Sequence, residues 1–302
     1  MDVRQLEMFR AVAEEGTFTR AAERLHVSQS AITRQLQLLE YELGTLLLRR
    51  THHGVVLTPD GEVLLTTANR INSEIVDAVS QISGARDLQR GILSLGGGMT
   101  VALYVFPKLL KKFRSLYNNV ELKVTTGEAD TLLRLLRIRQ IDLALLTLPI
   151  VAPDLEVMPV LKEEMVVITA GNHPLGREHT VDARKLARYP FVLFESGSNT
   201  RKVVDDFFRE AGVAVNVVMQ TENVEIIKAM VASGLGISFL PYAAIASESR
   251  TGRFAWVRVR GHKLYRETAW IYMKSEYIPR AVTEVLRVFD GMKKQFGGNP
   301  PR

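Results

Sequence analysis

The stretch Thr17–Leu43, TFTRAAERLHVSQSAITRQLQLLEYEL, decides the fold of the N-terminal part of the chain. Its apolar residues recur at helical spacing in two stripes: Phe18, Ala21, Ala22 and Leu25, then Ile32, Leu36, Leu39 and Leu43. Residues 25–28, between the stripes, suffice only for a tight turn, and Ser28 is a favourable N-cap for the second helix. Two short helices joined this tightly predict a helix-turn-helix.

The second of these helices carries polar side chains away from its apolar stripe, namely Gln29, Ser30, Thr33, Arg34 and Gln37. Glutamine pairs with adenine, serine and threonine donate or accept, and arginine binds guanine or phosphate. We therefore expect double-stranded DNA to be contacted by Ser28, Gln29, Ser30, Thr33 and Arg34, with Gln37 at the flank. The alternative, in which these side chains form only a solvated helix face, stays open on the residues alone.

The composition is that of a globular protein of 302 residues, long enough for two domains. No apolar run reaches the ~18 residues that a membrane span needs. Asp2, Glu7 and Arg10 interrupt the N-terminus where a signal segment would lie. The chain has no cysteine, which excludes disulfides, thiolate metal sites and a cysteine nucleophile. Together these features predict a cytoplasmic protein with no membrane partner.

The net charge of +6 suggests a nucleic-acid partner, but its distribution matters more than its sum. Residues 1–90 contain 10 Lys and Arg against 12 Asp and Glu, whereas residues 91–302 contain 29 against 21. The expected DNA-binding segment is therefore not basic overall. Its positive side chains are clustered instead, at Arg20, Arg24, Arg34, Arg49, Arg50, His52 and His53. A local patch of this kind is sufficient to hold phosphates.

Two further segments complete the predicted DNA-binding domain, residues 1–58. Residues 3–14 form an amphipathic helix that ends at Gly16. Two apolar runs, 46–48 and 55–57, flank a polar, glycine-containing turn and predict a β-hairpin, or wing. We expect this wing to contact DNA through Arg49, Arg50 and His53. We expect no metal at the two neighbouring histidines, because adjacent residues of a hairpin point to opposite faces.

A long helix is predicted after the hairpin, since Thr58 supplies a cap hydroxyl and Pro59 occupies the first helical position. Its apolar residues recur at alternating spacings of four and three: Leu64, Ala68, Ile71, Ile75, Ala78 and Ile82. Such a seam needs a partner helix, so residues 59–90 are predicted to form a dimerisation helix and hinge. The alternative is that the seam packs on its own domain. The glycine-flanked segment 84–91 marks the domain boundary.

From Ile92 onward, strands alternate with helices in two sets. The first set has strands at 92–95, 120–125 and 143–147 and helices at 100–116 and 129–138. The second set has strands at 164–170, 191–194, 215–220 and 237–240 and helices at 181–187, 200–211 and 224–233. The chain ends with a strand at 268–273 and a helix at 278–296. This alternation predicts parallel sheets covered on both faces. We therefore predict a regulatory domain, 91–302, of two hinged lobes, 91–161 with 268–302 and 162–267.

The chain resembles the LysR-type transcriptional regulators over nearly all of its length. The N-terminal matches are dense and in the family's spacing, and they include Phe18, Ala21, Ala22, Leu25, Ser28, Gln29, Ser30, Arg34, Leu39, Glu40, Gly44, Arg50, Thr58 and Gly61. Later matches keep the family's order: Ile141-Asp142-Leu143-Ala144, His173-Pro174-Leu175, Ser196-Gly197-Ser198-Asn199-Thr200-Arg201, Gly234-Leu235-Gly236-Ile237 and Pro241. Two wing residues depart from the pattern, since the family usually has phenylalanine at Leu48 and arginine at His53.

This resemblance implies an α/β fold class with an all-α winged helix-turn-helix N-terminal domain and a C-terminal two-lobed domain like the periplasmic binding proteins. It implies a homodimer that assembles into a homotetramer on partly palindromic DNA, and a small-molecule effector between the lobes. It implies neither a catalytic residue nor a cofactor. A neutral His53 would attract the minor groove less strongly than an arginine.

The candidate effector site is formed by two polar, glycine-containing segments, residues 96–100 and 196–201, which each come just before a predicted helix. Strand ends and helix N-termini offer free N–H groups and hydroxyls, which suit a carboxylate or another anion. We expect an anionic effector to contact Gly98, Met99, Thr100, Thr147, Ser196, Ser198, Asn199, Thr200 and Arg201, with Phe239 and Ile226 as possible walls. The alternative is that Thr100 and Ser198 only cap their helices.

Enzymatic functions find little support in the residues. Gly96, Gly97 and Gly98 lack the GxGxxG spacing of a dinucleotide site, and no acidic residue ends the second strand. The run Gly197-Ser198-Asn199 does not form a nucleophile elbow, so we expect no enzyme. Two alternatives to an effector-controlled regulator remain: a regulator of the same fold that needs no ligand, and an α/β enzyme fused to a DNA-binding module.

Overall fold

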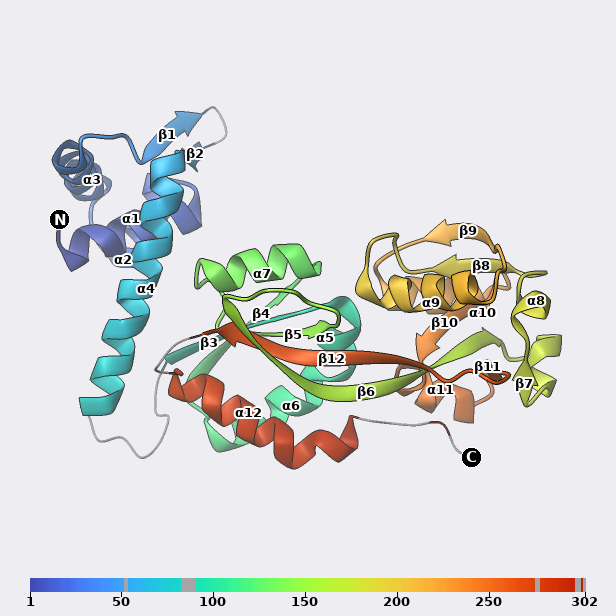
Figure 1. The fold of residues 1–302 in the computed structure, drawn as a ribbon. Helices are drawn as coiled ribbons and strands as arrows, with labels where there is room; N and C mark the ends of the chain where they lie inside the picture. The colour runs from blue at the N-terminus through green and yellow to red at the C-terminus, as the bar shows by residue number, and fades with distance from the viewer. Residues whose placement is uncertain (52–53, 83–90, 275–277, 297–299, 301–302) are drawn as a thin grey trace. The chain divides into compact units, whose positions relative to one another are not determined.

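The computed structural model describes residues 1–51, 54–82, 91–274, 278–296 and 300. The predicted wing tip at His52 and His53 and most of the predicted domain boundary lie outside the described residues. The chain divides into two compact units, residues 1–87 with 134–140 and residues 88–133 with 141–302 (Figure 1).

Three helices build the N-terminal unit: α1 (Val3–Glu15), α2 (Phe18–Leu25) and α3 (Gln29–Leu43). Ser28 caps α3, because its Oγ accepts a hydrogen bond from the N–H of Ala31 at 3.2 Å. α1 ends at Gly16, whose φ of 69° lies in the left-handed region that other residues avoid. The three helices share one core, in which Phe9, Ile32 and Leu39 are fully buried. The predicted helix-turn-helix is confirmed.

The wing is a two-stranded antiparallel hairpin of β1 (Leu48–Thr51) and β2 (Gly54–Leu57). The sequence predicts a turn that already starts at Arg49, and this prediction is wrong, since Arg49 and Arg50 belong to β1. Strand pairing uses backbone groups, so a polar residue on an exposed hairpin does not interrupt it. The Glu40 carboxylate of α3 accepts the N–H groups of Leu47 and Leu48 at 2.8 and 3.2 Å, which fixes the hairpin against α3.

The long helix α4 (Pro59–Ile82) follows, and Thr58 Oγ1 caps it by accepting the N–H of Gly61 at 3.0 Å. The predicted seam has two parts. Leu64 packs against the core of the N-terminal unit and Ala68 is buried, whereas Ile75 is 39 % exposed and Ala78 is exposed as well. Packing on its own domain therefore accounts only for the first part of the seam.

The second unit is built on an eight-stranded sheet of order β4-β3-β5-β12-β6-β11-β7, with β10 also paired to β6. The strands are β3 (Gly91–Gly97), β4 (Val120–Thr126), β5 (Leu143–Thr147), β6 (Leu155–Ala170), β7 (Thr180–Val181), β10 (Ser238–Pro241), β11 (Phe254–Val259) and β12 (Leu264–Met273). β3 is parallel to β4 and β5, but β10, β11 and β12 are antiparallel to β6. The prediction of wholly parallel sheets is wrong, because these pairings are long-range and no local pattern reveals them.

β6 and β12 run side by side through both lobes (Figure 1). Their register shifts between Thr268 and Ala269, where the strands pass from one lobe to the other. The sequence underestimates both strands: β6 begins at Leu155 and not at Glu164, and β12 begins at Leu264 and not at Thr268. β11 is not predicted at all.

Lobe two adds a parallel pair, β8 (Pro190–Leu193) and β9 (Asn216–Gln220). α9 (Asn199–Glu210) covers one hydrophobic core, and α10 (Val224–Ala232) covers another. Two short helices, α8 (Ala183–Leu186) and α11 (Ala246–Arg250), complete the lobe.

Lobe one packs three helices around the buried Trp270 of β12: α5 (Met99–Tyr104), α6 (Phe106–Leu116) and α12 (Arg280–Met292). α7 (Ala129–Arg137) lies between β4 and β5 in the chain. The sequence predicts one helix over 100–116, but the structure breaks it at Val105. Pro107 explains the break, since proline fits the first turn of a helix and disrupts its interior.

Gly61→Ala should destabilise the N-terminal unit by about 1–3 kcal/mol. A Cβ at this position would lie 2.1 Å from the carbonyl oxygen of Leu47, so the start of α4 would have to move away from the hairpin. Amide hydrogen exchange in α1–α3 measures the effect on this unit alone.

Gly291→Ala is the matched control, because Gly291 also lies in a helix and a Cβ there would meet no atom within 4 Å. We expect it to be neutral or to stabilise by up to about 1 kcal/mol. Equal losses in the two variants would contradict the steric explanation.

Candidate functional site

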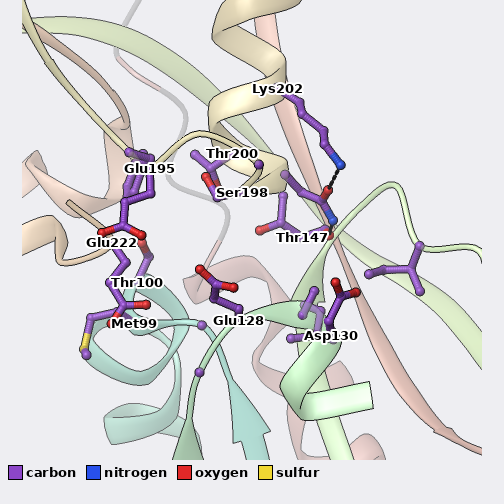
Figure 2. A pocket seen from close by; sticks show the side chains of 18 of the residues that line it. Met99, Thr100, Glu128, Asp130, Thr147, Glu195, Ser198, Thr200, Lys202 and Glu222 are labelled. Atoms are coloured by element: carbon purple, nitrogen blue, oxygen red, sulfur yellow. Dashed lines mark hydrogen bonds between the residues drawn. The ribbon is translucent and has the colours of Figure 1, made fainter. Parts of the chain in front are cut away.

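A cavity of about 420 Å³ lies where parallel strands of the two lobes end (Figure 2). β3, β4 and β5 end at Gly97, Thr126 and Thr147, and β8 and β9 end at Leu193 and Gln220. The residues that follow these ends line the cavity. Ligands of α/β folds usually bind at the carboxyl ends of parallel strands, and the volume is typical of a small-molecule site.

Most of the predicted effector residues line this cavity: Gly98, Met99, Thr100, Thr147, Ser196, Ser198, Asn199 and Thr200. Arg201 does not. Its guanidinium is buried in lobe two, where Nε donates to Asp205 at 2.7 Å and Nη1 donates to the carbonyl of Phe194 at 2.9 Å. Arg201 lies on the face of α9 that packs onto its own lobe, which corrects that prediction.

The two predicted cavity walls also lie elsewhere. Phe239 is fully buried in a hydrophobic core of lobe two, stacked among other aromatic rings. Ile226 is 40 % exposed on α10 and is not part of the lining. Both are apolar residues of regular elements, and hydrophobicity alone does not distinguish a core position from a pocket wall.

The N-terminus of α9 presents free hydrogen-bond donors to the cavity. Ser198 caps this helix by accepting the N–H of Arg201 at 3.2 Å, so the capping alternative is right for Ser198. The N–H groups of Asn199 and Thr200 have no partner among the described residues, as is usual in a first helical turn. The Thr200 hydroxyl is also without a partner there, although the residue is only 8 % exposed.

Lobe one contributes Gly98, Met99 and Thr100 at the start of α5. Gly98 occupies the N-cap position and makes no side-chain cap, so Thr100 does not cap the helix and the capping alternative is wrong for it. Thr100 is 7 % exposed, and its hydroxyl has no hydrogen-bond partner within the described part of the chain. The hydroxyl oxygen is not among the fully buried side-chain atoms without a partner, so it is accessible from the cavity and can bind a ligand there.

Asn199 connects the two lobes at the edge of the cavity. Its Nδ2 donates to the carbonyl oxygens of Thr147 at 2.7 Å and Pro149 at 3.0 Å, both in lobe one. Its Oδ1 accepts from Lys202 Nζ at 3.1 Å (Figure 2). Asn199 thereby holds the lobes together on one side of the cavity.

Arg266 of β12 also lines the cavity, and the sequence did not suggest it. It is 2 % exposed, and its Nε donates to Glu163 of β6 at 2.8 Å, its neighbour in the strand register. The Nη groups make no hydrogen bond to any described residue. No local pattern identifies it, since Arg266 lies outside the strand predicted at 268–273 and beside the polar Glu267 and Thr268.

Four carboxylates surround the same cavity, Glu128 and Asp130 from lobe one and Glu195 and Glu222 from lobe two (Figure 2). All four are exposed, and none forms an ion pair with a described residue. The sequence analysis did not single them out. Their common signal is position, since three of them lie two residues after the end of β4, β8 or β9.

The outer face of α3 carries the residues predicted to contact DNA. Gln29, Ser30 and Arg34 are exposed, and the side chains of Gln29 and Arg34 have no partner among the described residues. Thr33 is half-buried and donates to the carbonyl of Gln29 at 3.0 Å. Ser28 Oγ lies 3.0 Å from Ser30 Oγ.

The wing places Arg49 on the surface of β1. Of the other predicted wing contacts, Arg50 belongs to the same strand, but its side chain lies outside the described part of the structure, as does the whole of His53.

Two family models match the chain, the bacterial regulatory helix-turn-helix protein of the lysR family over residues 3–62 and the LysR substrate binding domain over residues 86–292. The chain belongs to the LysR family. It is therefore a DNA-binding transcriptional regulator with an effector-binding domain, and the predictions of this fold class and of a non-enzyme are confirmed.

Relatives and solved structures agree with this assignment to the LysR family. The transcriptional regulator CfxR of Cupriavidus necator is 33 % identical, over 100 % of this chain and 96 % of that protein. The transcriptional activator CmpR of a Synechocystis species is 32 % identical, over 91 % of this chain and 90 % of that protein. The structure of a full-length OxyR variant from Pseudomonas aeruginosa superposes on this chain with a TM-score of 0.82 at 25 % identity. The match covers 100 % of this chain and 99 % of the OxyR chain.

Within the described ranges of this LysR-family chain, no helix is both long and apolar enough to cross a membrane. The same residues contain no group of three or more histidine, cysteine, aspartate or glutamate side chains that could hold a metal ion.

A second polar cluster joins the two lobes of this LysR-family domain. Tyr104 of α5 donates to Glu225 of α10 and accepts from Lys228 Nζ at 2.7 Å. Lys228 is 3 % exposed and also pairs with Glu225 at 3.1 Å and Glu248 at 2.7 Å. Burial and the hydrogen bond to Glu225 raise the pKa of Tyr104 to about 12, so its phenol stays protonated at neutral pH.

Tyr104→Phe should lower the free energy of unfolding of the effector unit by about 1–2 kcal/mol, because the buried ammonium of Lys228 loses an acceptor. Denaturant titration followed by the fluorescence of Trp256 and Trp270 measures the loss. Tyr242→Phe is the control, since the Tyr242 hydroxyl makes no hydrogen bond to a described residue.

The pH dependence tests the raised pKa of Tyr104, to which burial contributes most and the hydrogen bond to Glu225 second. The folded state keeps a proton that the unfolded state releases above the ordinary tyrosine pKa. The contribution of the raised Tyr104 pKa to the free energy of unfolding should therefore be complete below pH about 10. It should be lost as the pH rises to about 12. A wild-type stability curve that parallels that of Tyr104→Phe over this range would contradict the assignment.

Proposed function

We propose that this LysR-family regulator responds to a small molecule with an anionic group, bound in the cavity between its lobes. The observation that carries the proposal is a set of donors, from both lobes, that face one cavity without partners. Thr100, Thr200 and Arg266 are each less than 10 % exposed, yet each presents free hydrogen-bonding groups there. An anion in the cavity could accept hydrogen bonds from these groups, which are accessible there.

In the proposed mechanism, ligand binding is coupled to the angle between the two lobes. A ligand changes an equilibrium only by binding one state better than another, so it must contact both lobes to change the angle between them. The Thr100 hydroxyl and the first turn of α9 belong to different lobes and line the same cavity. The chain has no cysteine, so a thiol-based switch is not available to it.

DNA recognition is proposed for the exposed face of α3, with Ser28, Gln29, Ser30, Thr33 and Arg34 at the major groove. The hairpin residues Arg49, Arg50 and His53 are proposed to hold phosphate or the minor groove. CbnR, which is 26 % identical, has been solved in complex with its target DNA, and this supports a similar use of the fold here.

A homodimer that assembles into a homotetramer is proposed as well. The second part of the α4 seam supports it, since the apolar Ile75 is 39 % exposed in the single chain. A partner helix that covered Ile75 and Ala78 would complete the seam in the manner of a coiled coil.

Arg34→Ala should weaken binding to the preferred DNA site by about 1–3 kcal/mol if Arg34 contacts a base, and by a similar factor on every sequence if it contacts phosphate. Selection from a random DNA library followed by titration at physiological salt measures both. Arg4→Ala is the matched control, because Arg4 is an exposed arginine on α1. Unchanged affinity on all sequences would refute the role of Arg34.

Gly98→Phe should abolish the response to small molecules and leave the fold intact. Gly98 lines the cavity, and a Cβ there would meet no atom within 4 Å, so the ring can occupy the cavity without backbone strain. The measurement is the melting temperature, followed by tryptophan fluorescence, with and without the small-molecule fraction of a cell extract. Ligand binding should raise it by a few degrees in the wild type.

Gly291→Phe serves as the control, since Gly291 is exposed on α12 and equally open. It should respond like the wild type. A shift of equal size in Gly98→Phe would place the binding outside this cavity, and no shift in the wild type, together with unchanged DNA binding, would favour a regulator that needs no ligand.

A further inference from the structure

We propose that the effector carries a positively charged amine or guanidinium in addition to its anionic group, so that the cavity selects a zwitterion of the size of an amino acid. This inference rests on the proposed function, because it names the chemical class of the molecule in the same cavity. It goes beyond the expectation of a simple anion.

The first observation is the excess of negative charge at the cavity. Six charged side chains line it: Glu128, Asp130, Glu195, Glu222, Lys202 and Arg266. This local excess runs against the chain as a whole, which has a net charge of +6. A site meant for a bare anion would be expected to show the opposite imbalance.

The second observation is that Arg266 is paired with a carboxylate, whereas the four cavity carboxylates are not paired with a cation of any described residue. The Arg266 charge is compensated by Glu163 at 2.8 Å, and both side chains are almost completely buried. Lys202 donates to the Asn199 amide. None of the four carboxylates has an ion-pair partner among the described residues. These exposed carboxylates are therefore available to a cation from outside the chain.

The third observation is that donors and acids lie in different environments of one cavity. The unpartnered hydroxyls of Thr100 and Thr200 belong to residues that are 7 and 8 % exposed, and Arg266 is 2 % exposed. The four carboxylates are exposed. A molecule with its anion at the buried donors would therefore direct its other end toward the acids, where an ammonium or a guanidinium is the complementary group.

An organic cation fits these acids better than a metal ion does. A bound divalent cation needs several oxygen ligands within about 2.0–2.6 Å. No three acidic or histidine side chains of the described residues converge closely enough for that. Glu128 and Asp130 come from the start of α7 in lobe one, and Glu195 and Glu222 from two loops of lobe two, so an extended organic ion can contact acids that are spread in this way (Figure 2).

The same charges would give the site its selectivity and its link to lobe movement. A dicarboxylate would place its second charge near Glu128 or Glu222 and be repelled. Acids of the two lobes that face one cavity also repel one another. A cation between them relieves that repulsion, so a zwitterion favours the closed arrangement more than an anion of the same shape does.

Three matched series of compounds test this inference on the full chain: the twenty amino acids of proteins, the carboxylates that lack their α-amino group, and the amines that lack their α-carboxylate. Calorimetry and melting temperatures report binding, and Gly98→Phe shows which binding depends on the cavity. At least one amino acid should bind about tenfold more tightly than both of its matched compounds. Glu128→Gln with Glu222→Gln should remove most of this preference, whereas Glu210→Gln, an exposed glutamate of α9 outside the cavity, should not.

The outcomes separate this inference from the proposed function. Cavity-dependent binding by the carboxylates alone, or an amino-acid affinity unchanged in the double variant, would overturn the zwitterion and leave an anion-binding effector site. Absence of binding in all three series would overturn the zwitterion too. The proposed function falls with it only if the small-molecule fraction of a cell extract also has no effect on the wild type.

Discussion

The antiparallel ladder between β6 and β12 is the constraint on which the effector unit depends. β5, β10 and β11 pair directly with one of these two strands, and the pair runs through both lobes. The ion pair Arg266–Glu163 joins the two strands next to the register shift, with both side chains buried. Removing either partner would leave a buried charge uncompensated, which is far more costly than the net gain from the pair.

This ladder also explains where the cavity lies. β5 ends at Thr147, which pairs with Thr268 where β12 passes from one lobe to the other. β8 and β9 form a separate sheet of lobe two, and the residues after their ends line the same cavity. Asn199 and Tyr104 then connect the lobes at separate points, through Thr147 in one case and Lys228 in the other. In the proposed mechanism, the shared strands let the lobes change their angle, and these polar contacts limit that change in the absence of a ligand.

Local sequence patterns predicted the N-terminal unit well because its structure is local. The periodicity of α1–α3, the cap at Ser28 and the stop at Gly16 each depend on a few neighbouring residues. The lobes were harder. Pro159 and the charged run from Lys162 to Glu164 conceal a strand of sixteen residues, because a proline and successive charges resemble a loop unless the partner strand is known.

The candidate site shows the same division between local and long-range information. Strand ends and helix starts were recognisable, so the segments around Thr100 and Ser198 were found. The interpretation of Arg201 failed because the side chain points inward, where Nη1 donates to the Phe194 carbonyl and to Gln220 Oε1. Arg266 was missed because its position depends on the pairing of β12 with β6, and the four acids because they are scattered between residues 128 and 222 until the fold gathers them.

The charges of the two parts bear on how such a regulator would work. Residues 1–90 carry fewer basic than acidic side chains, 10 against 12, so one copy of the N-terminal unit has little general attraction for DNA. In the proposed complex, tight binding depends on specific contacts from α3 and the wing, made by two copies at once. In the proposed dimer, a change in the angle between lobes need not alter any DNA-contacting residue. It is enough that the spacing of two recognition helices fits, or no longer fits, two half-sites on the duplex.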